Sequence, residues 1–369
     1  MLNVLYIKLF GGVMKKTIKR LLFGLLAVLI IVIAAFGLMF GKEIQTIASI
    51  KKVDDYGMYS IEYQADYGLD KLVQSGGASS DSELVSFVVG NLLKGLPLKF
   101  NIPDFGCSTF QAKTEDGDWL FGRNYDLNYV PSMIVKTNPK NGYASLSVAN
   151  ISVLGYDADK LPDNFASGIM SLAAPYVMMD GMNEMGFSIG VLLIKDEPTQ
   201  QNTDKLDLTT TSAMRWLLDK AANVEEAIAM LENMDMHASA NASYHFQMAD
   251  AQGNSAVIEY IDNELRVIRK EPDGLQYLTN FLISEDVYGF GKGQDRYEIL
   301  ENTLTQNHGI LSEMESMDLL QAVSQDKISE DTGKQTATQW SVVYNNTKKT
   351  AKIVAGRNYD TVIEVSLSR

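Results

Sequence analysis

The feature that most constrains this chain is an uncharged run near its start. Leu21–Phe40 reads LLFGLLAVLIIVIAAFGLMF, twenty residues without a charged side chain. A helix rises about 1.5 Å per residue, so this run spans about 30 Å, which matches the hydrocarbon core of a bilayer. The sequence therefore predicts one transmembrane helix at residues 21–40, after a basic N-terminus at residues 1–20.

The charges beside the run predict its orientation. Lys15, Lys16, Lys19 and Arg20 lie directly before it. Basic residues stay on the cytoplasmic side, so we expect a single-pass cell-membrane protein whose body is extracytoplasmic. A cleavable signal peptide is the alternative, but its apolar region is usually shorter and ends at a small-x-small site. The sequence MKK makes Met14 a second candidate for the true start.

Charge and composition exclude several classes of partner. Residues 1–106 hold 11 Lys and Arg against 9 Asp and Glu, so the net charge of −14 comes from a remainder near −16. A body this acidic argues against nucleic acid. One cysteine excludes an intrachain disulfide, and three scattered histidines do not form a zinc motif. We expect no metal and no cofactor, and a homo-oligomer is left open.

The pattern of the chain changes at Cys107. Residues 41–106 read as a connecting region or propeptide, in which Asp81 is predicted to cap a helix over Ser82–Leu93. From Cys107 on, short strands are followed by helices, then strands, helices and strands again. This order predicts an α+β fold in residues 107–369, with antiparallel sheets and helices packed on the outside.

Cys107 lies at the start of a predicted hairpin. The turn EDGD at residues 115–118 joins two strands, and antiparallel pairing then brings Arg123 and Asp126 back beside the cysteine. A lone cysteine is often only a small buried apolar residue. A neighbouring cation, however, lowers the pKa of a thiol, and the thiolate is a nucleophile. The spacing therefore makes Cys107 a candidate nucleophile.

The pentapeptide GRNYD occurs twice. The first copy, Gly122–Asp126, lies within this hairpin, and the second copy is Gly356–Asp360. The second copy has no cysteine at hairpin distance, so we predict that it lies outside the site.

Several separated motifs share one family pattern. They are GCSTF with FGRNYD, DGMNEMGFSIG at Asp180–Gly190, YLTNF at Tyr277–Phe281, DRY at Asp295–Tyr297, and TQWSVVYNNTKKTAKI at Thr338–Ile353. In this order they resemble the linear amide C–N hydrolase (choloylglycine hydrolase) family of N-terminal nucleophile (Ntn) hydrolases, which includes bile salt hydrolases and penicillin V acylases. The resemblance extends from Cys107 to the C-terminus.

The resemblance implies a fold and a reaction. The fold would be a four-layer αββα sandwich of two antiparallel sheets. Cleavage of the Gly106–Cys107 bond would free the α-amine of Cys107, which would serve as the base for its own thiol. The thiolate would then open the amide bond of a small-molecule N-acyl substrate through an acyl-thioester, without a cofactor.

The resemblance also implies roles for further residues. Arg123 would favour the thiolate, Asp126 would orient the amine, Asn183 and Asn280 would stabilise an oxyanion, and Arg296 would be a second active-site arginine. Each of the last three has a structural alternative. Asn183 suits a turn, Asn280 can end a strand, and Arg296 can lie on a helix surface.

Two other functions use the same residues. An acyltransferase would resolve the thioester with an amine, and an inactive relative would bind ligands at the membrane without turnover. The 106 residues before Cys107 raise a further question. After a cut, the body would either stay through contacts with the preceding residues or be released.

Overall fold

The computed structural model describes most of the chain. The described residues are 39–98, 106–194, 196–328 and 335–367, together with residues 19, 21–23, 25–26, 28–29, 37 and 333. The chain divides into two compact units, Met1–Gln45 and Thr46–Arg369. Residues before and after Cys107 therefore share the second unit.

The described residues of the first unit are helical. Within the described part of the chain, no helix combines the length and the apolar character of a membrane span. The predicted anchor at Leu21–Phe40 lies in large part outside the described residues, as do the N-terminus at 1–20 and the alternative start at Met14. These three stay predictions.

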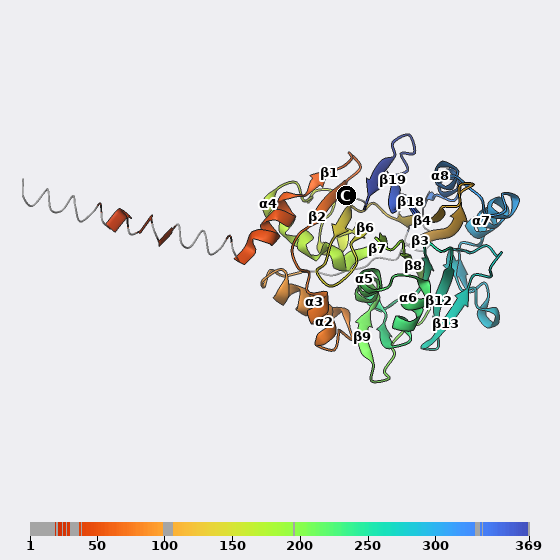
Figure 1. Ribbon diagram of the computed structural model, residues 1–369, viewed down its shortest axis with the longest axis horizontal. Helices are drawn as coiled ribbons and strands as arrows, with labels where there is room; N and C mark the ends of the chain where they lie inside the picture. Colours follow the sequence, from red (N-terminus) through yellow and green to blue (C-terminus); the bar gives the residue numbers. More distant parts are fainter. Residues whose placement is uncertain are drawn as a thin grey trace, which may run out of the picture. The chain divides into compact units, whose positions relative to one another are not determined.

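Most strands of the second unit form two sheets (Figure 1). The first sheet has nine strands in the order β1-β2-β5-β6-β7-β8-β11-β12-β13. Its strands are β1 (Lys51–Lys52), β2 (Met58–Tyr63), β5 (Ser132–Thr137), β6 (Ser145–Asn150), β7 (Met178–Asn183), β8 (Ser188–Ile194), β11 (Ser243–Ala249), β12 (Ser255–Ile261) and β13 (Glu264–Arg269).

The second sheet has seven strands in the order β14-β3-β4-β18-β19-β20, and β17 pairs with β18. Its strands are β3 (Gly106–Lys113), β4 (Trp119–Leu127), β14 (Tyr277–Leu278), β17 (Asp326–Ile328), β18 (Gln335–Asn345), β19 (Thr350–Ala355) and β20 (Ile363–Ser366). Two small pairs, β9 (Leu206–Thr209) with β10 (Met234–His237) and β15 (Asn280–Phe281) with β16 (Gly291–Lys292), complete the strands.

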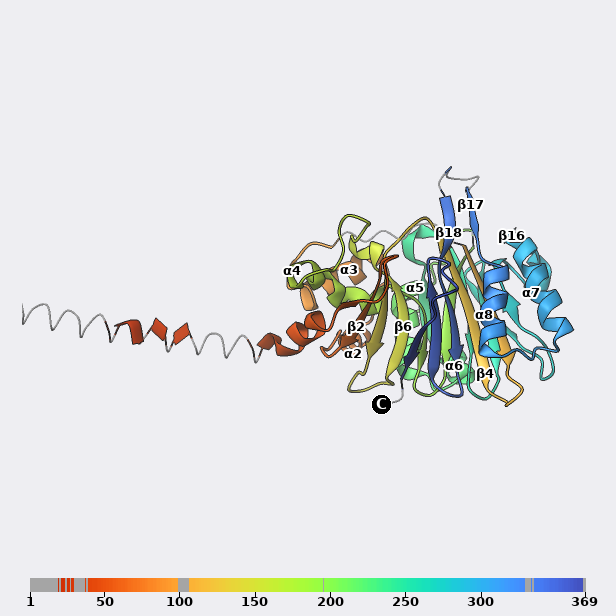
Figure 2. The same ribbon diagram turned by 90° about the horizontal axis from the view of Figure 1, so that it is seen from above.

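Helices cover the outer faces of both sheets. The α-helices are α2 (Leu69–Gln74), α3 (Asp81–Asn91), α4 (Phe165–Gly168), α5 (Thr210–Lys220), α6 (Val224–Leu231), α7 (Gln294–Gln306) and α8 (Glu313–Ala322). The 3₁₀ turns are η1 (Ile151–Leu154), η2 (Ile169–Val177), η3 (Ser239–Asn241) and η4 (Glu285–Val287). Helix α5 packs on β7, and α7 packs on β3. Helix α8 packs on β4 and β18 (Figure 2).

The side chains of β4 and β7 point alternately to the two faces of their sheets, and their partners give the order of the layers of helices and sheets. Arg123 of β4 bonds to Asp180 of β7, while its neighbour Asn124 bonds to the carbonyl of Leu320 in α8. In β7, the residue after Asp180 is Gly181, where an added Cβ would lie 2.8 Å from Leu218 Cδ2 of α5. Successive side chains of a strand point to opposite faces. The order is therefore helices, first sheet, second sheet, helices.

One part of the predicted fold needs correction. The second sheet is antiparallel, but the first sheet is mixed because β2 and β5 run parallel, with Met58 opposite Ser132 and Tyr63 opposite Thr137. Strand β2 comes from the region that the sequence analysis read as a connecting region. The chain from β2 to β5 crosses from one sheet to the other through β3 and β4, which is long enough to make the two strands parallel.

The connecting region also contains the predicted helix. Helix α3 begins at Asp81, and its N-cap is Ser80, whose hydroxyl accepts a hydrogen bond from the Glu83 N–H at 3.3 Å. The prediction placed the cap one residue too late, because Ser80 and Asp81 are both good N-cap residues.

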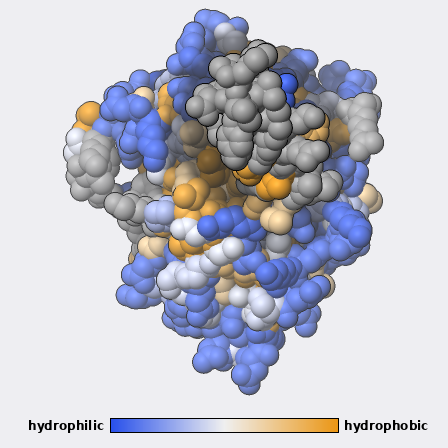
Figure 3. Space-filling view, turned by 90° about the vertical axis from the view of Figure 1, so that its left-hand side faces the viewer, coloured by the Kyte–Doolittle hydropathy of each residue, from blue (hydrophilic) through white to orange (hydrophobic). Residues whose placement is uncertain are grey.

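One face of the molecule carries mostly polar side chains. In Figure 3, polar side chains cover most of the visible face, and apolar side chains gather near its centre. The core lies between the two sheets, and a second apolar cluster lies under α7 and α8.

Candidate active site

The predicted hairpin is confirmed. Strand β3 pairs with β4, which places Gly106 opposite Asp126, Cys107 opposite Tyr125 and Thr109 opposite Arg123. Cys107 and Arg123 therefore share the face toward the first sheet, and Asp126 lies on the other face beside Gly106. The peptide bond between Gly106 and Cys107 therefore has the thiol and Arg123 on one face of the sheet and Asp126 on the other.

Cys107 is fully buried. Its backbone N–H donates a hydrogen bond of 2.7 Å to Asn280 Oδ1, and its Sγ–H donates to the carbonyl oxygen of Val191 at 3.6 Å. Burial raises the pKa of the thiol to about 12, although the charges of Arg123 and Arg296 act to lower it. A cation beside a thiol is expected to lower its pKa, but in the uncut chain removal of Cys107 from water outweighs the cations.

Arg123 is buried beside the thiol with part of its guanidinium unpaired. Its Nε–H donates to Asp180 Oδ2 at 3.3 Å, and the pair is fully buried. Among the described residues, Arg123 Nη1 and Nη2 have no hydrogen-bond partner. Guanidinium donors held beside the thiol can bind an oxygen atom or a carboxylate.

Asp180 holds Arg123 in place, a role that was not predicted from the sequence. Trp340 Nε1–H donates to Asp180 at 2.9 Å, and the Tyr344 hydroxyl donates at 2.6 Å. Asp180 opens the DGMNE motif from which only Asn183 was chosen. The motif was the available signal, but the partners of Asp180 lie some 160 residues away, where the sequence gives no pairing.

Asp126 is held by three donors. It accepts hydrogen bonds from the Thr338 hydroxyl at 2.6 Å, from Gln325 Nε2 at 2.9 Å and from Arg296 Nη1 at 3.4 Å. A Cβ at position 106 would lie 3.1 Å from Gln325 Nε2 and 3.3 Å from Asp126 Cβ. The close fit favours glycine before the cysteine. Thr338 belongs to the TQWS motif, whereas Gln325 carried no sequence signal.

Arg296 and Asn280 bind the two backbone polar groups of Cys107, its carbonyl oxygen and its N–H. Arg296 Nη1 donates to the carbonyl oxygen of Cys107 and to Ser108 Oγ, the latter at 2.8 Å. Its Nη2 donates to Asn280 Oδ1 at 2.9 Å, the same oxygen that accepts the Cys107 N–H. Asn280 Nδ2 donates to the carbonyl oxygen of Leu193 at 2.9 Å. The structure thus brings both residues to the cysteine.

Asn183 lies elsewhere and its donors are used. Its Nδ2 donates to the carbonyl oxygens of Leu218 at 3.0 Å and Ala221 at 2.7 Å. Its Oδ1 accepts from the N–H groups of Met185 and Phe187, both at 3.1 Å. The side chain therefore joins the turn after β7 to the end of α5. This geometry corrects the expected oxyanion role in favour of the turn, because no N–H is left for a substrate.

A second buried network supports the residue before Asn280. His245 Nε2 lies 2.7 Å from the carbonyl oxygen of Thr279, and its Nδ1 lies 3.4 Å from Glu259. Glu259 also accepts from the N–H and the hydroxyl of Ser284. These contacts fix both ends of the strand that carries Asn280.

The site brings together a thiol, a backbone N–H and a guanidinium group. Among the described residues, no group of three or more His, Cys, Asp or Glu side chains is arranged to hold a metal ion. The cysteine nitrogen is held by an amide oxygen, its thiol lies beside a buried cation, and its preceding glycine faces a carboxylate. Together with the stacked sheets, these features define the α+β fold type of the Ntn hydrolases.

Comparisons with known proteins agree with this class. Residues 107–282 match the model of the linear amide C–N hydrolases, choloylglycine hydrolase family. A bile salt hydrolase/transferase from Clostridium perfringens (strain 13 / Type A) is 26% identical over 185 residues, covering 47% of this chain and 53% of that protein. A penicillin V acylase from Pectobacterium atrosepticum is 30% identical over 112 residues, covering 27% of this chain and 29% of that protein.

A solved structure shares the fold. The crystal structure of a mutant conjugated bile acid hydrolase from Clostridium perfringens aligns with a TM-score of 0.50 and 17% identity, covering 71% of this chain and 92% of that chain. Residues 107–282 are therefore similar to the linear amide C–N hydrolases of the choloylglycine hydrolase family. Its matched region spans about half the length of the bile salt hydrolase/transferase and less of the penicillin V acylase.

Proposed function

We propose that this protein hydrolyses the amide bond of a small N-acyl compound, with Cys107 as nucleophile and its own α-amine as base. One observation carries the proposal. The Cys107 nitrogen is bonded to Asn280 Oδ1 at 2.7 Å, and Arg296 bonds to both Asn280 and the Cys107 carbonyl. The nitrogen that would become the base is therefore held in place before the chain is cut.

The first step would be cleavage of the chain before Cys107. The thiol adds to the carbonyl carbon of Gly106, and the C–N bond breaks as the Cys107 nitrogen takes up the thiol proton. Water then hydrolyses the thioester, which leaves a carboxylate on Gly106 and a free amine and thiol on Cys107. Asp126 lies beside Gly106 and its charge would hold the new amine, which has an ordinary pKa of about 7.7–8.0.

Turnover would use the same thiol. Sγ attacks the carbonyl carbon of the substrate amide, and the thiol proton passes to the Cys107 amine. The amine then gives that proton to the leaving nitrogen as the C–N bond breaks. Water attacks the acyl-thioester, releases the acid and restores the thiol. The free donors of Arg123 would bind the polar end of the substrate near the thiol.

Acyl transfer is the second candidate. A relative named bile salt hydrolase/transferase matches 47% of this chain. The thioester is the same in both reactions, and the product depends on whether water or an amine reaches it. An inactive binding protein is the third possibility, and the assembled Cys107, Arg123, Asp126, Asn280 and Arg296 argue against it.

A panel of N-acyl amides tests the proposal. Acyl chain and amine head group are varied independently, and free acid is measured for the wild type and for Cys107→Ala. We expect acid from at least one acyl class with the wild type and none with the variant. If transfer dominates, added glycine or taurine attacks the acyl-thioester, so that a new amide forms in place of free acid and the thiol is restored. Acid release that persists in Cys107→Ala, or no release from any amide, would overturn the proposal.

We also propose that Leu21–Phe40 anchors the enzyme in the cell membrane with the body outside the cytoplasm. The uncharged length and the preceding basic residues support this proposal. Several described side chains of the run are exposed, among them Leu21 at 62%, Phe23 at 77% and Leu25 at 64%. Protease added to intact cells is expected to digest the body, and a body that is protected unless the cells are lysed would contradict the orientation.

A further inference from the structure

Residues 46–98, which we call the N-terminal segment, precede the proposed cut but are built into the fold. Strand β2 pairs with β5 over six positions, from Met58 opposite Ser132 to Tyr63 opposite Thr137. Met58 and Ile61 are at most 1% exposed. If the segment left, the backbone N–H and C=O groups of β5 would lose their partners, which is costly for a sheet edge.

Buried hydroxyl groups join the segment to the rest of the unit. The Tyr63 hydroxyl donates to the Leu172 carbonyl at 2.6 Å, and the Tyr67 hydroxyl donates to Asp219 Oδ2 at 2.6 Å. In the other direction, the Tyr176 hydroxyl donates to the Tyr67 carbonyl at 2.9 Å. Each bond satisfies a polar group that would otherwise be buried without a partner.

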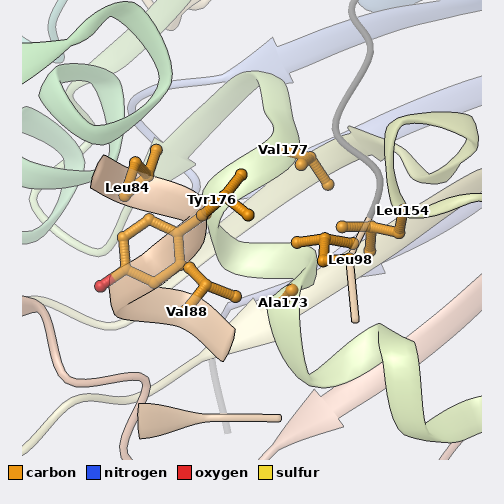
Figure 4. A pocket seen from close by; sticks show the side chains of 8 residues that line it. Leu84, Val88, Leu98, Leu154, Ala173, Tyr176 and Val177 are labelled. Carbon is orange, nitrogen blue, oxygen red and sulfur yellow. The ribbon is translucent and has the colours of Figure 1, made fainter. Parts of the chain in front are cut away.

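An apolar contact extends the interface through α3. A small pocket is lined by Leu84, Val85, Val88 and Leu98 of the segment on one side and by Leu154, Ala173, Tyr176 and Val177 on the other. Figure 4 shows Leu84 and Val88 of α3 beside the ring of Tyr176. At the start of α3, Asp81 Oδ2 accepts the Ala240 N–H at 2.7 Å. The apolar pocket and this hydrogen bond therefore both join the N-terminal segment to residues that follow Cys107 in the chain.

We infer that, after cleavage at Gly106–Cys107, the N-terminal segment stays bound as a non-covalent subunit of the enzyme. The inference rests on the proposed cleavage. The occupant of the interface is the protein's own segment, which supplies two strands of the nine-stranded sheet and one wall of the apolar pocket. The mature enzyme is then a heterodimer, and an anchor at Leu21–Phe40 would keep the catalytic part at the membrane without a covalent link.

Purification of the full chain tests this inference. On a denaturing gel, we expect one fragment that ends at Gly106 and one that begins with Cys107. In native size-exclusion chromatography in detergent, both are expected in one peak at equal molar amounts, separating only in denaturant. Two fragments that elute in separate native peaks would overturn the inference while leaving the proposed cleavage intact. A single uncut chain would instead overturn the cleavage.

A second arm tests the interface even if the natural cut fails. A site for a sequence-specific protease is inserted between Leu98 and Gly106 in the Cys107→Ala chain, and the chain is cut after purification. The two pieces are expected to co-elute in native buffer. Separation of the pieces in this buffer would contradict the inference without any reference to the chemistry of Cys107.

A matched pair of substitutions in β2 locates the contact. Ile61 is buried and its neighbour Glu62 is exposed on the same strand. Ile61→Asp is expected to lower the urea concentration at which the cut pieces separate. Glu62→Gln removes only an exposed pair with Lys136 at 3.5 Å and is expected to change that concentration little. Equal midpoints for both variants would contradict the interface. If Ile61→Asp does not fold, Tyr67→Phe, which removes only the hydroxyl bond to Asp219, gives the same comparison.

Discussion

The two copies of GRNYD have the same sequence and different structures. The first copy, Gly122–Asp126, lies inside strand β4, between β3 and β18. The second copy, Gly356–Asp360, follows β19 and forms a turn in which Gly356 and Arg357 have φ angles of 56° and 63°. Five identical residues thus form a strand in one place and a turn in the other, and the difference comes from their neighbours.

The two arginines show the consequence. Arg123 is 0% exposed and pairs with the buried Asp180. Arg357 has a side chain 35% exposed and pairs with Asp326 at 2.5 Å. Only the first has unpaired donors beside a thiol. The motif alone therefore does not define the site, since its value depends on the cysteine strand that pairs with it.

The largest expected effect comes from the cysteine that only the first copy faces. Cys107→Ala removes the only candidate nucleophile, so we expect no cleavage before residue 107 and no amide hydrolysis. A gel of the purified variant and an acid-release assay measure both effects. Turnover at the wild-type rate would exclude Cys107 as the nucleophile, and with it the distinction between the two copies.

The two arginines form a matched pair for stability. Arg123→Met leaves Asp180 buried without its ion partner, which is expected to lower the free energy of unfolding by about 3–5 kcal/mol. Arg357→Met removes an exposed pair, which contributes little. Urea denaturation of both variants in the Cys107→Ala chain compares them without interference from cleavage. Equal losses would show that the burial of the first copy is energetically unimportant.

The two aspartates form a matched pair for processing. Asp126→Asn removes a charge that faces Gly106 and pairs with Arg296, and a hydrogen bond to a charged group contributes about 1.5–3 kcal/mol. We expect cleavage to slow by about 10–100-fold on that scale. Asp360→Asn changes an exposed turn residue and is expected to leave the rate unchanged. Pulse-chase of the precursor gives both rates, and an equal slowing in both variants would contradict the role of Asp126.

The smallest expected effect is a difference in pH dependence between the two arginine partners. Burial raises the pKa of Asp180, although the charge of Arg123 acts to lower it. Hydrogen bonding from Gln335 and then the charge of Arg357 lower the pKa of Asp326. A raised folded-state pKa gives stability that is present at low pH and lost as the pH rises through that value. A lowered pKa gives stability that is lost as the pH falls.

Unfolding between pH 3 and pH 7 checks the two signs. Relative to its Asp180→Asn variant, the Cys107→Ala chain is expected to lose stability as the pH rises. Relative to its Asp326→Asn variant, the same chain is expected to gain stability over the same range, because the unfolded chain binds more protons at this group. Slopes of the same sign would contradict the opposite environments of the two copies.

The sequence predicted the hairpin and the site well where local spacing was sufficient. A short turn and the alternation of β3 and β4 place Arg123 and Asp126 beside Cys107, and the exclusion of the second GRNYD followed from the same spacing. Asn183 was mistaken because a turn asparagine and an oxyanion asparagine look alike in sequence. Their difference lies in partners such as Leu218 and Ala221, which only the fold supplies.

The N-terminal segment was missed for a related reason. Strand β2 reads MYSIEY, and Tyr59, Ile61 and Tyr63 are buried while Ser60 and Glu62 between them are more exposed. This short alternation is typical of a half-buried strand, but it stands alone in a region without a neighbouring strand signal. Its parallel pairing with β5 crosses two strands of the other sheet, and no local signal predicts such a contact. Asp180 is comparable, because its role depends on Trp340 and Tyr344.

The central claim is that the chain is cut before Cys107. Mass spectrometry of the purified protein, which identifies the first residue of each fragment, tests this claim most directly. The account predicts that wild-type protein contains a fragment that begins with Cys107 and carries a free α-amine. The Cys107→Ala chain, prepared in parallel, is expected to remain uncut at this position. If the wild type also remains uncut between Gly106 and Cys107 while it hydrolyses an N-acyl amide, the nitrogen held by Asn280 is not the base, and the account is contradicted.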